Sequence, residues 1–277
     1  MTDLNSVPEA SLALRMLRLL PRGYGKALTT LPAWVWGGEI VQVATEIGPM
    51  AVPTTDPAAF EILLRRRHHD VYESELVRRL VSGSTTVVDV GASVGWYSCL
   101  AWHAGVRDVL AVEPNADILR ALMANASIRP GIRVVQAAAG ARSGTVTLYR
   151  AKSSDLSSTV RVVGSPVEVP QVRLDDICVQ ADFVKCDVEG GEIEVLEGAE
   201  QLCASRPVWM LEAALTWLAE RGRSLDDLEE VLSIRLPGSR MYFFDSGGML
   251  RELSRLSDIA ETTRANVFVV PPDRHLP

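Results

Sequence analysis

The amino-acid sequence predicts an α/β fold with a mostly parallel sheet, flanking helices and an N-terminal extension. From residue 85 onward, short β-branched or apolar runs alternate with longer amphipathic segments. A loop containing two glycines, Gly91 and Gly95, joins the first of these runs to the first of these segments. Hydrophobic residues make up 47% of the 277 residues, enough to bury a sizeable core. Strands that alternate with helices form βαβ units, whose strands lie parallel in one sheet.

The expected elements follow one another in a regular order. The strands of the sheet are expected at 85–90, 108–112, 133–137, 183–186 and 208–211, with two late strands at 241–244 and 266–270. The helices between them are expected at 95–104, 117–128, 192–202 and 225–234. An insertion of strands is expected at 145–149, 157–163 and 167–172. Ahead of the sheet, short strands are expected at 39–45 and 49–52, and helices at 10–20, 57–67 and 74–81.

Two parts of the chain are distinguished by these patterns. Residues 1–70 form an N-terminal extension of helices and short strands, and residues 71–277 form the main α/β domain. The amphipathic segment 10–20 favours packing on the main domain or on a partner subunit over insertion into a membrane surface. We therefore expect the extension to cap the acceptor site or to form a homo-oligomer contact.

Composition and charge exclude several classes of protein. The net charge is −7, and residues 181–277 hold 10 basic and 18 acidic side chains. A basic stripe of the kind that binds a phosphate backbone is absent, so a nucleic-acid partner is not expected. The sequence contains neither an apolar run long enough to span a bilayer nor a secretory N-terminal pattern. Its four cysteines form no metal-binding spacing, which favours reduced thiols and a cytoplasmic location.

The loop Asp89-Val-Gly-Ala-Ser-Val-Gly95 is the first candidate binding site. Its G-x-x-x-G spacing lacks the middle glycine of dinucleotide sites, and an acid at the end of the strand would repel phosphate. Such an acid suits the cationic amino-acid end of S-adenosylmethionine. An ordinary tight turn gives the same pattern, so the loop alone leaves that alternative open. The residues expected to bind this cofactor are Asp89, Gly91, Ala92, Ser93 and Gly95.

Glu113 ends the second strand, about twenty residues after the loop, where an acid can accept hydrogen bonds from both ribose hydroxyls. Pro114 breaks the chain after it, and Asn115 is expected beside the adenine ring. Ala138 follows the third strand and is small enough to leave room for that ring. Together with Asp89, Glu113 predicts a nucleoside site.

Acids also follow the fourth strand, in the run Asp182-Phe-Val-Lys-Cys-Asp-Val-Glu-Gly-Gly-Glu192. Asp187 is expected to orient the ammonium group of the cofactor or the hydroxyl of the acceptor, and Glu189 to act as a general base. His69, upstream of the first strand, is a further candidate base, although a polar helix end explains it equally well. Asp187 and Glu189 could bind Mg²⁺, but two acids at this spacing are common, and a metal is not predicted.

Four segments in order resemble the motifs of the FkbM family of methyltransferases. They are Val88-Asp-Val-Gly-Ala-Ser-Val-Gly-Trp-Tyr-Ser98, Val112-Glu-Pro-Asn115, Val172-Arg-Leu-Asp-Asp-Ile177 and Phe183-Val-Lys-Cys-Asp-Val-Glu-Gly-Gly-Glu-Ile-Glu-Val-Leu-Glu-Gly-Ala199. Two positions differ from the family pattern, since Ser93 replaces Asn and Gly191 replaces Ala. The resemblance implies a class I methyltransferase with a seven-stranded Rossmann-like sheet. It also adds Glu73, Tyr97 and Ser98 to the expected cofactor site.

The family resemblance implies a function in which S-adenosylmethionine donates a methyl group and leaves as S-adenosylhomocysteine. It further implies O-methylation of a small hydroxylated acceptor, such as a sugar or a secondary metabolite. Two alternatives use a similar sheet: a nicotinamide-dependent oxidoreductase and a scaffold that binds a cofactor without catalysis. The missing middle glycine and Asp89 disfavour the first, and the retained acids at the strand ends disfavour the second.

Overall fold

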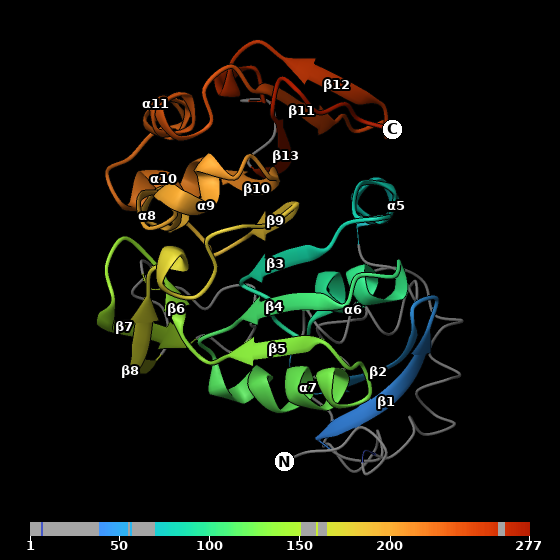
Figure 1. Cartoon of the computed structure of the whole chain (residues 1–277). Coiled ribbons are helices and arrows are strands. Elements are labelled where there is room, and N and C mark those ends of the chain that lie inside the picture. The colour runs from blue at the N-terminus through green and yellow to red at the C-terminus, as the bar shows by residue number, and fades with distance from the viewer. Residues whose placement is uncertain are drawn as a thin grey trace.

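The computed structural model describes residues 7, 39–54, 56, 70–150, 159, 165–259 and 264–277. The helices expected at 10–20 and 57–67 lie outside these residues, as do most of the strand expected at 157–163 and the histidines His68 and His69. In the part of the chain that is described, one large sheet carries helices on both faces (Figure 1).

The described residues form a central sheet of eight strands in the order β12-β11-β13-β10-β9-β3-β4-β5 (Figure 1). Five neighbouring strands run parallel: β5 (Ile132–Val135), β4 (Asp108–Val112), β3 (Thr86–Val90), β9 (Phe183–Cys186) and β10 (Val208–Ala214). Three antiparallel pairings extend the sheet beyond β10 through β13 (Arg264–Val270), β11 (Arg240–Phe244) and β12 (Leu250–Leu253). The α/β fold with a mostly parallel sheet is confirmed, and β12 adds one strand to the seven expected.

The strand order reverses at β3. β4 and β5 extend the sheet to one side of β3, and the chain then returns to place β9 on the other side. In open parallel sheets, ligands bind beyond the carboxyl ends of the strands at such a reversal. The loops that follow β3, β4 and β9 therefore meet where a ligand is expected.

Helices cover both faces of the sheet. One face packs against α5 (Val71–Leu80), α6 (Trp96–His103) and α7 (Ala116–Ser127). The other packs against α8 (Glu192–Glu197), α9 (Glu200–Ala204), α10 (Leu215–Glu220) and α11 (Leu225–Arg235), and the short 3₁₀ helices are η4 (Leu174–Asp176) and η5 (Leu256–Ile259). In β3, Val87 packs with the first set of helices and Val88 with the second. Because successive side chains of a strand point to opposite faces, a strand buried on both faces is mostly apolar.

Two smaller β structures accompany the main sheet. β1 (Ile40–Thr45) and β2 (Gly48–Pro53) form an antiparallel hairpin that packs against α7 and joins the core. β6 (Ala138–Ala139), β7 (Gly144–Arg150) and β8 (Ser165–Val172) form a three-stranded sheet that lies between β5 and β9 in sequence. Of the strands expected in this insertion, those at 145–149 and 167–172 are confirmed as β7 and β8. The roles of the N-terminal extension as a cap or an oligomer contact stay predictions.

The prediction of a single helix at 192–202 is wrong, because the structure divides this segment into α8 and α9 at Gly198. A side chain at Gly198 would overlap the carbonyl oxygen of Gly140. Asp175 then caps the second helix, accepting hydrogen bonds from the backbone nitrogens of Gln201 at 3.1 Å and Leu202 at 3.0 Å. The break therefore depends on contacts with residues far away in the sequence.

Candidate active site

The loop between β3 and α6 is shaped by its two glycines. Gly91 and Gly95 have φ angles of 71° and 84°, in the left-handed region that favours glycine. A side chain at Gly91 would also overlap the carbonyl oxygen of Asp187, so the loops after β3 and β9 touch at this point. The backbone nitrogens of Gly91 and Ala92 donate to the carbonyl oxygen of Val112 at 2.9 and 3.1 Å. The loop is thus held against the end of β4.

Asp89 is the penultimate residue of β3, just before this loop. It is buried and joins the strand to α6. Its Oδ2 atom accepts hydrogen bonds from the backbone nitrogen of Ser98 at 2.9 Å and from the Ser98 hydroxyl at 2.6 Å. Its Oδ1 atom lies 3.8 Å from Nζ of Lys185. Two expected cofactor residues, Asp89 and Ser98, therefore contact each other and fix the two ends of the loop.

Glu113 connects the loop after β3 to the loop after β4. Its Oε2 atom accepts a hydrogen bond from the backbone nitrogen of Ser93, and its Oε1 atom accepts one from that of Asn115, both at 2.8 Å. Burial raises the pKa of Glu113 to about 7, although these two hydrogen bonds oppose the shift. The carboxylate predicted to face the ribose thus lies directly against the glycine loop, as the sequence spacing requires.

Lys185 is a buried lysine in β9 beneath the same loop. Its Nζ atom donates to the carbonyl oxygen of Gly91 at 2.7 Å and lies 3.5 Å from Oδ2 of Asp187. Burial alone would lower the pKa of Lys185, but the charges of Asp187 and Asp89 outweigh it and raise the pKa. Lys185 thus places a buried positive charge between the carboxylates of Asp187 and Asp89.

Three carboxylates converge beside the loop. Asp187, Glu189 and Glu212 place one oxygen each within 4.8 Å of the others. Glu212 lies on β10, the neighbour of β9, and forms an ion pair with Arg264 of β13. Burial and the charge of Asp187 raise the pKa of Glu212 well above its usual value. This group of Asp187, Glu189 and Glu212, called the carboxylate cluster below, has the oxygen donors that a divalent cation accepts, and Arg264 supplies a positive charge to it.

Residues of α5 and α6 border the site on the other side. The Tyr97 hydroxyl donates to Oδ2 of Asp70 at 3.2 Å, and the Tyr97 ring lies 5.9 Å from Nζ of Lys185. Burial raises the pKa of Glu73, which also hydrogen-bonds Asn266 of β13. Tyr97 and Glu73, added to the site by the family resemblance, thus stand near the buried lysine and β13 respectively.

Two expected site residues make contacts within the protein, and a third is not described. The side chain of Asn115 caps α7 by accepting a hydrogen bond from the backbone nitrogen of Asp117 at 3.1 Å. Ala138 is buried in β6 with Leu148 and Val169 of the small sheet. His69 lies outside the described residues. Contacts of Asn115 and Ala138 with adenine, and a role of His69 as a base, stay predictions.

Sequence motifs do not identify Glu212 and Arg264 as residues of this site. Glu212 is the sole charge in the otherwise apolar strand β10. An acid in an otherwise buried strand is the signal that could have identified it, because buried carboxylates require partners. Arg264 carries no such signal, since only the pairing of β13 with β10 brings it to Glu212.

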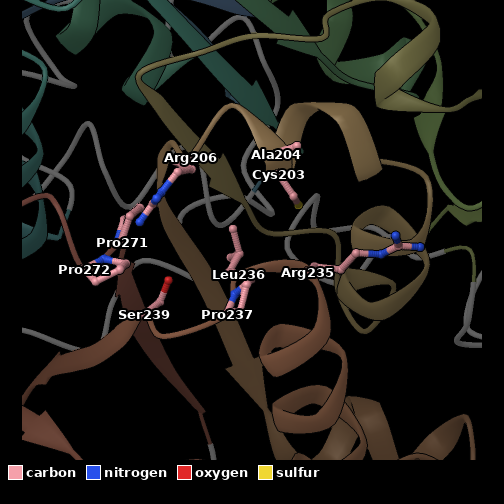
Figure 2. Close-up of a pocket in the computed structure, with 9 residues that line it drawn as sticks. All are labelled: Cys203, Ala204, Arg206, Arg235, Leu236, Pro237, Ser239, Pro271 and Pro272. Carbon is pink, nitrogen blue, oxygen red and sulfur yellow. The ribbon is translucent and has the colours of Figure 1, made fainter.

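A separate pocket of about 220 Å³ lies at the opposite ends of the strands, near the start of β10 and the end of β13. Figure 2 shows Arg206 extending toward Pro271 and Pro272 at its border. Arg206 pairs with Asp273 at 2.9 Å, and Arg235 with Glu200 at 3.5 Å. This pocket is distinct from the carboxylate cluster, because Glu212 lies toward the other end of β10.

The fold defines a Rossmann-like sheet, and the loops after β3, β4 and β9 meet at its switch point. The model of the methyltransferase FkbM domain matches residues 89–241, which is more than half of the chain. The chain therefore belongs to the FkbM methyltransferase family, and it is an S-adenosylmethionine-dependent methyltransferase. The alternative of a nicotinamide-dependent oxidoreductase is set aside by this assignment.

Several solved structures are similar at low identity. A precorrin-6y C5,15-methyltransferase from Geobacter metallireducens is 15% identical, with a TM-score of 0.41 over 73% of this chain and 88% of that chain. TYW2 from M. jannaschii, in complex with AdoMet, is 14% identical, with a TM-score of 0.42 over 83% and 84% of the two chains. A SAM-dependent methyltransferase from Agrobacterium tumefaciens is 11% identical, with a TM-score of 0.45 over 84% and 69%. The curated proteins contain no match.

Proposed function

We propose that this methyltransferase transfers the methyl group to a hydroxyl of a small acceptor, such as a sugar or a secondary metabolite. The observation that carries the proposal is the carboxylate cluster, which lies directly beside the glycine loop through the contact of Asp187 with Gly91. A hydroxyl is a poor nucleophile until its proton is removed, and closely spaced carboxylates can accept that proton.

The residues around the loop fit S-adenosylmethionine. Gly91 and Gly95 allow the backbone to approach a ligand closely, and Glu113 offers its carboxylate to the ribose hydroxyls. Oδ1 of Asp89 is buried, accepts no hydrogen bond from the described residues and faces the ammonium group of Lys185 at 3.8 Å. We assign Asp89, the loop and Glu113 to binding of the cofactor.

When bound, S-adenosylmethionine supplies a methyl group already activated by its positively charged sulfur. Held by Asp89, the glycine loop and Glu113, it would supply this methyl carbon for in-line displacement by the acceptor oxygen, and the electron pair of the carbon–sulfur bond would leave with sulfur. Asp187 or Glu189 takes the hydroxyl proton, and Glu212 with Arg264 holds the cluster in place. The protein contributes mainly alignment and removal of the proton.

The charges at the site also bear on the acceptor. The carboxylate cluster would repel a phosphate group, and Arg264 is already paired with Glu212. This arrangement supports a neutral or cationic small molecule over a nucleic acid. In the described residues, none of the helices is long and apolar enough to cross a membrane.

The test is methyl transfer from labelled S-adenosylmethionine to a panel of sugars, polyketides and matched amines, with the products identified by mass spectrometry. We expect the methyl group on oxygen of at least one hydroxylated acceptor. Methylation confined to amines, or confined to RNA included in the same panel, would contradict the proposal.

A further inference from the structure

Asn125 links the N-terminal hairpin to the glycine loop, and we propose that it is a positioning residue for the cofactor. It holds the backbone of Val94 in the conformation that lets Ser93 and Gly91 face the ligand. The inference rests on the proposed binding of S-adenosylmethionine by this loop. It assigns a functional role to β1 and β2, which contain none of the family motifs.

The side-chain amide of Asn125 donates two hydrogen bonds and accepts one. Its Nδ2 atom donates to the carbonyl oxygen of Val94 at 2.8 Å and to that of Ala51 at 2.9 Å, while its Oδ1 atom accepts from the backbone nitrogen of Ala51 at 2.6 Å. The side chain lies on α7 and is 0% exposed. One buried amide therefore ties three segments together: the hairpin at Ala51, the glycine loop at Val94 and α7.

The hydrogen bond from Asn125 reaches the glycine loop at Val94, beside the strained backbone of Ser93. Val94 stands between Ser93, with a φ of 51°, and Gly95, with a φ of 84°. Backbone in this region is costly for a non-glycine residue and persists only where its surroundings hold it. The backbone nitrogen of Ser93 donates to Glu113, so a shift at Val94 would also displace the carboxylate assigned to the ribose.

Arg129, which directly follows the C-cap of α7, provides a matched comparison. It is buried, and its guanidinium donates to the carbonyl oxygens of Ile47 at 3.2 Å, Pro49 at 2.8 Å and Asn125 at 2.9 Å. Arg129 thus fastens the hairpin to the end of α7, but its hydrogen bonds do not reach the glycine loop. Removing it should loosen the hairpin without releasing Val94.

The test compares Asn125→Asp with Arg129→Met by calorimetric titration with S-adenosylhomocysteine and by thermal unfolding. Aspartate keeps the acceptor for the backbone nitrogen of Ala51 but loses both donors, leaving the carbonyl oxygens of Val94 and Ala51 without these hydrogen bonds. We expect both variants to unfold at lower temperature, and only Asn125→Asp to bind S-adenosylhomocysteine more weakly, by about tenfold. Unchanged affinity of Asn125→Asp, or equal weakening by Arg129→Met, would overturn the inference.

A second measurement uses the wild-type protein and so does not depend on the variants folding. Coupling between two sites is reciprocal, so a ligand held by the loop should protect the hairpin. We expect S-adenosylhomocysteine to slow hydrogen exchange at the amide of Ala51 as well as in the loop. Protection confined to the loop would refute the role of Asn125. Failure of the wild-type protein to bind S-adenosylhomocysteine at all would instead refute the proposed cofactor site.

Discussion

Glu113 is the residue whose ionisation should control binding of the cofactor. Its pKa is raised to about 7 by burial, and the ionised form accepts the hydrogen bonds of Ser93 and Asn115. Protonation below this pH removes acceptor capacity that the ribose hydroxyls need. The affinity for S-adenosylhomocysteine should therefore rise as the pH increases through about 7.

The variant Glu113→Gln tests this assignment by titration calorimetry at pH 6, 7 and 8. Glutamine keeps the size of the side chain but has one acceptor oxygen, so we expect weaker binding and a flatter pH dependence. The exposed substitution Glu252→Gln on β12 serves as the control. A pH dependence that survives in Glu113→Gln would assign the titration to another group.

The ionisation of Glu113 and of Glu192 also makes the stability of the fold depend on pH. The pKa of Glu113 and that of Glu192 are both raised to about 7 in the folded protein, above the ordinary value of 4.5. Between these values the folded state binds more protons than the unfolded state, so the contribution of both groups to stability falls as the pH rises from 4.5 to about 7. Above about 7 their contribution no longer changes.

Asp187 is the residue most directly assigned to the chemistry. Asp187→Asn removes a carboxylate from the cluster while keeping its shape, and Asp187 is also placed beside Gly91. We expect kcat for methyl transfer to fall by about 10²- to 10⁴-fold, as for loss of a general base. The dissociation constant of S-adenosylhomocysteine should change far less. A loss of affinity that accounts for the whole loss of rate would show that Asp187 binds the cofactor and takes no part in proton transfer.

Metal dependence is tested at the same cluster. Because Arg264 already pairs with Glu212 and supplies a positive charge, we expect methyl transfer to persist in EDTA. The measurement is the initial rate before and after treatment with EDTA. A loss of activity that Mg²⁺ restores would instead make Asp187, Glu189 and Glu212 metal ligands.

At the scale of elements, the α8–α9 break shows how a distant side chain sets a helix boundary. Asp175 of η4 caps α9 through two backbone nitrogens. Asp175→Ala should lower the free energy of unfolding by about 1–2 kcal/mol, as measured for other lost caps. Urea denaturation followed by circular dichroism checks this value, with Glu252→Ala as the control. An effect no larger than that of the control would show that Gly198, and not the cap, divides the helix.

The regular strands and helices could be predicted because each buries a periodic apolar face. The break at Gly198 could not, since its cause is the close approach of Gly140 and the cap from Asp175. The helix α10 has only six residues, and β12 only four, so neither carries enough periodicity to identify it. β12 is a strand because β11 is available to pair with it.

The candidate site also contains residues that the sequence predicts and residues that only the tertiary structure identifies. Asp89 lies near the end of β3, and Gly91 and Glu113 follow β3 and β4, so the sequence alone places these residues at one edge of the sheet. Glu212 belongs to the carboxylate cluster, and Arg264 pairs with it, only because β10 lies between β9 and the antiparallel strand β13. That order depends on the tertiary packing and cannot be deduced from residue spacing.

At the scale of the whole molecule, the sheet gathers the proposed cofactor site from β3 and β4 and the proposed reaction centre from β9 and β10. The hairpin β1–β2 supports the first of these from outside the family motifs, through Asn125. A ligand held by these loops stabilises the folded state by mass action. Binding of the cofactor should therefore be visible in the unfolding of the entire protein.

The most direct test of the account is a calorimetric titration of the wild-type protein with S-adenosylhomocysteine and, separately, with NADH. Glu113 and the G-x-x-x-G loop predict binding of S-adenosylhomocysteine with one site per chain, weakened in Glu113→Gln, and no binding of NADH. Binding of NADH without binding of S-adenosylhomocysteine would contradict the central claim.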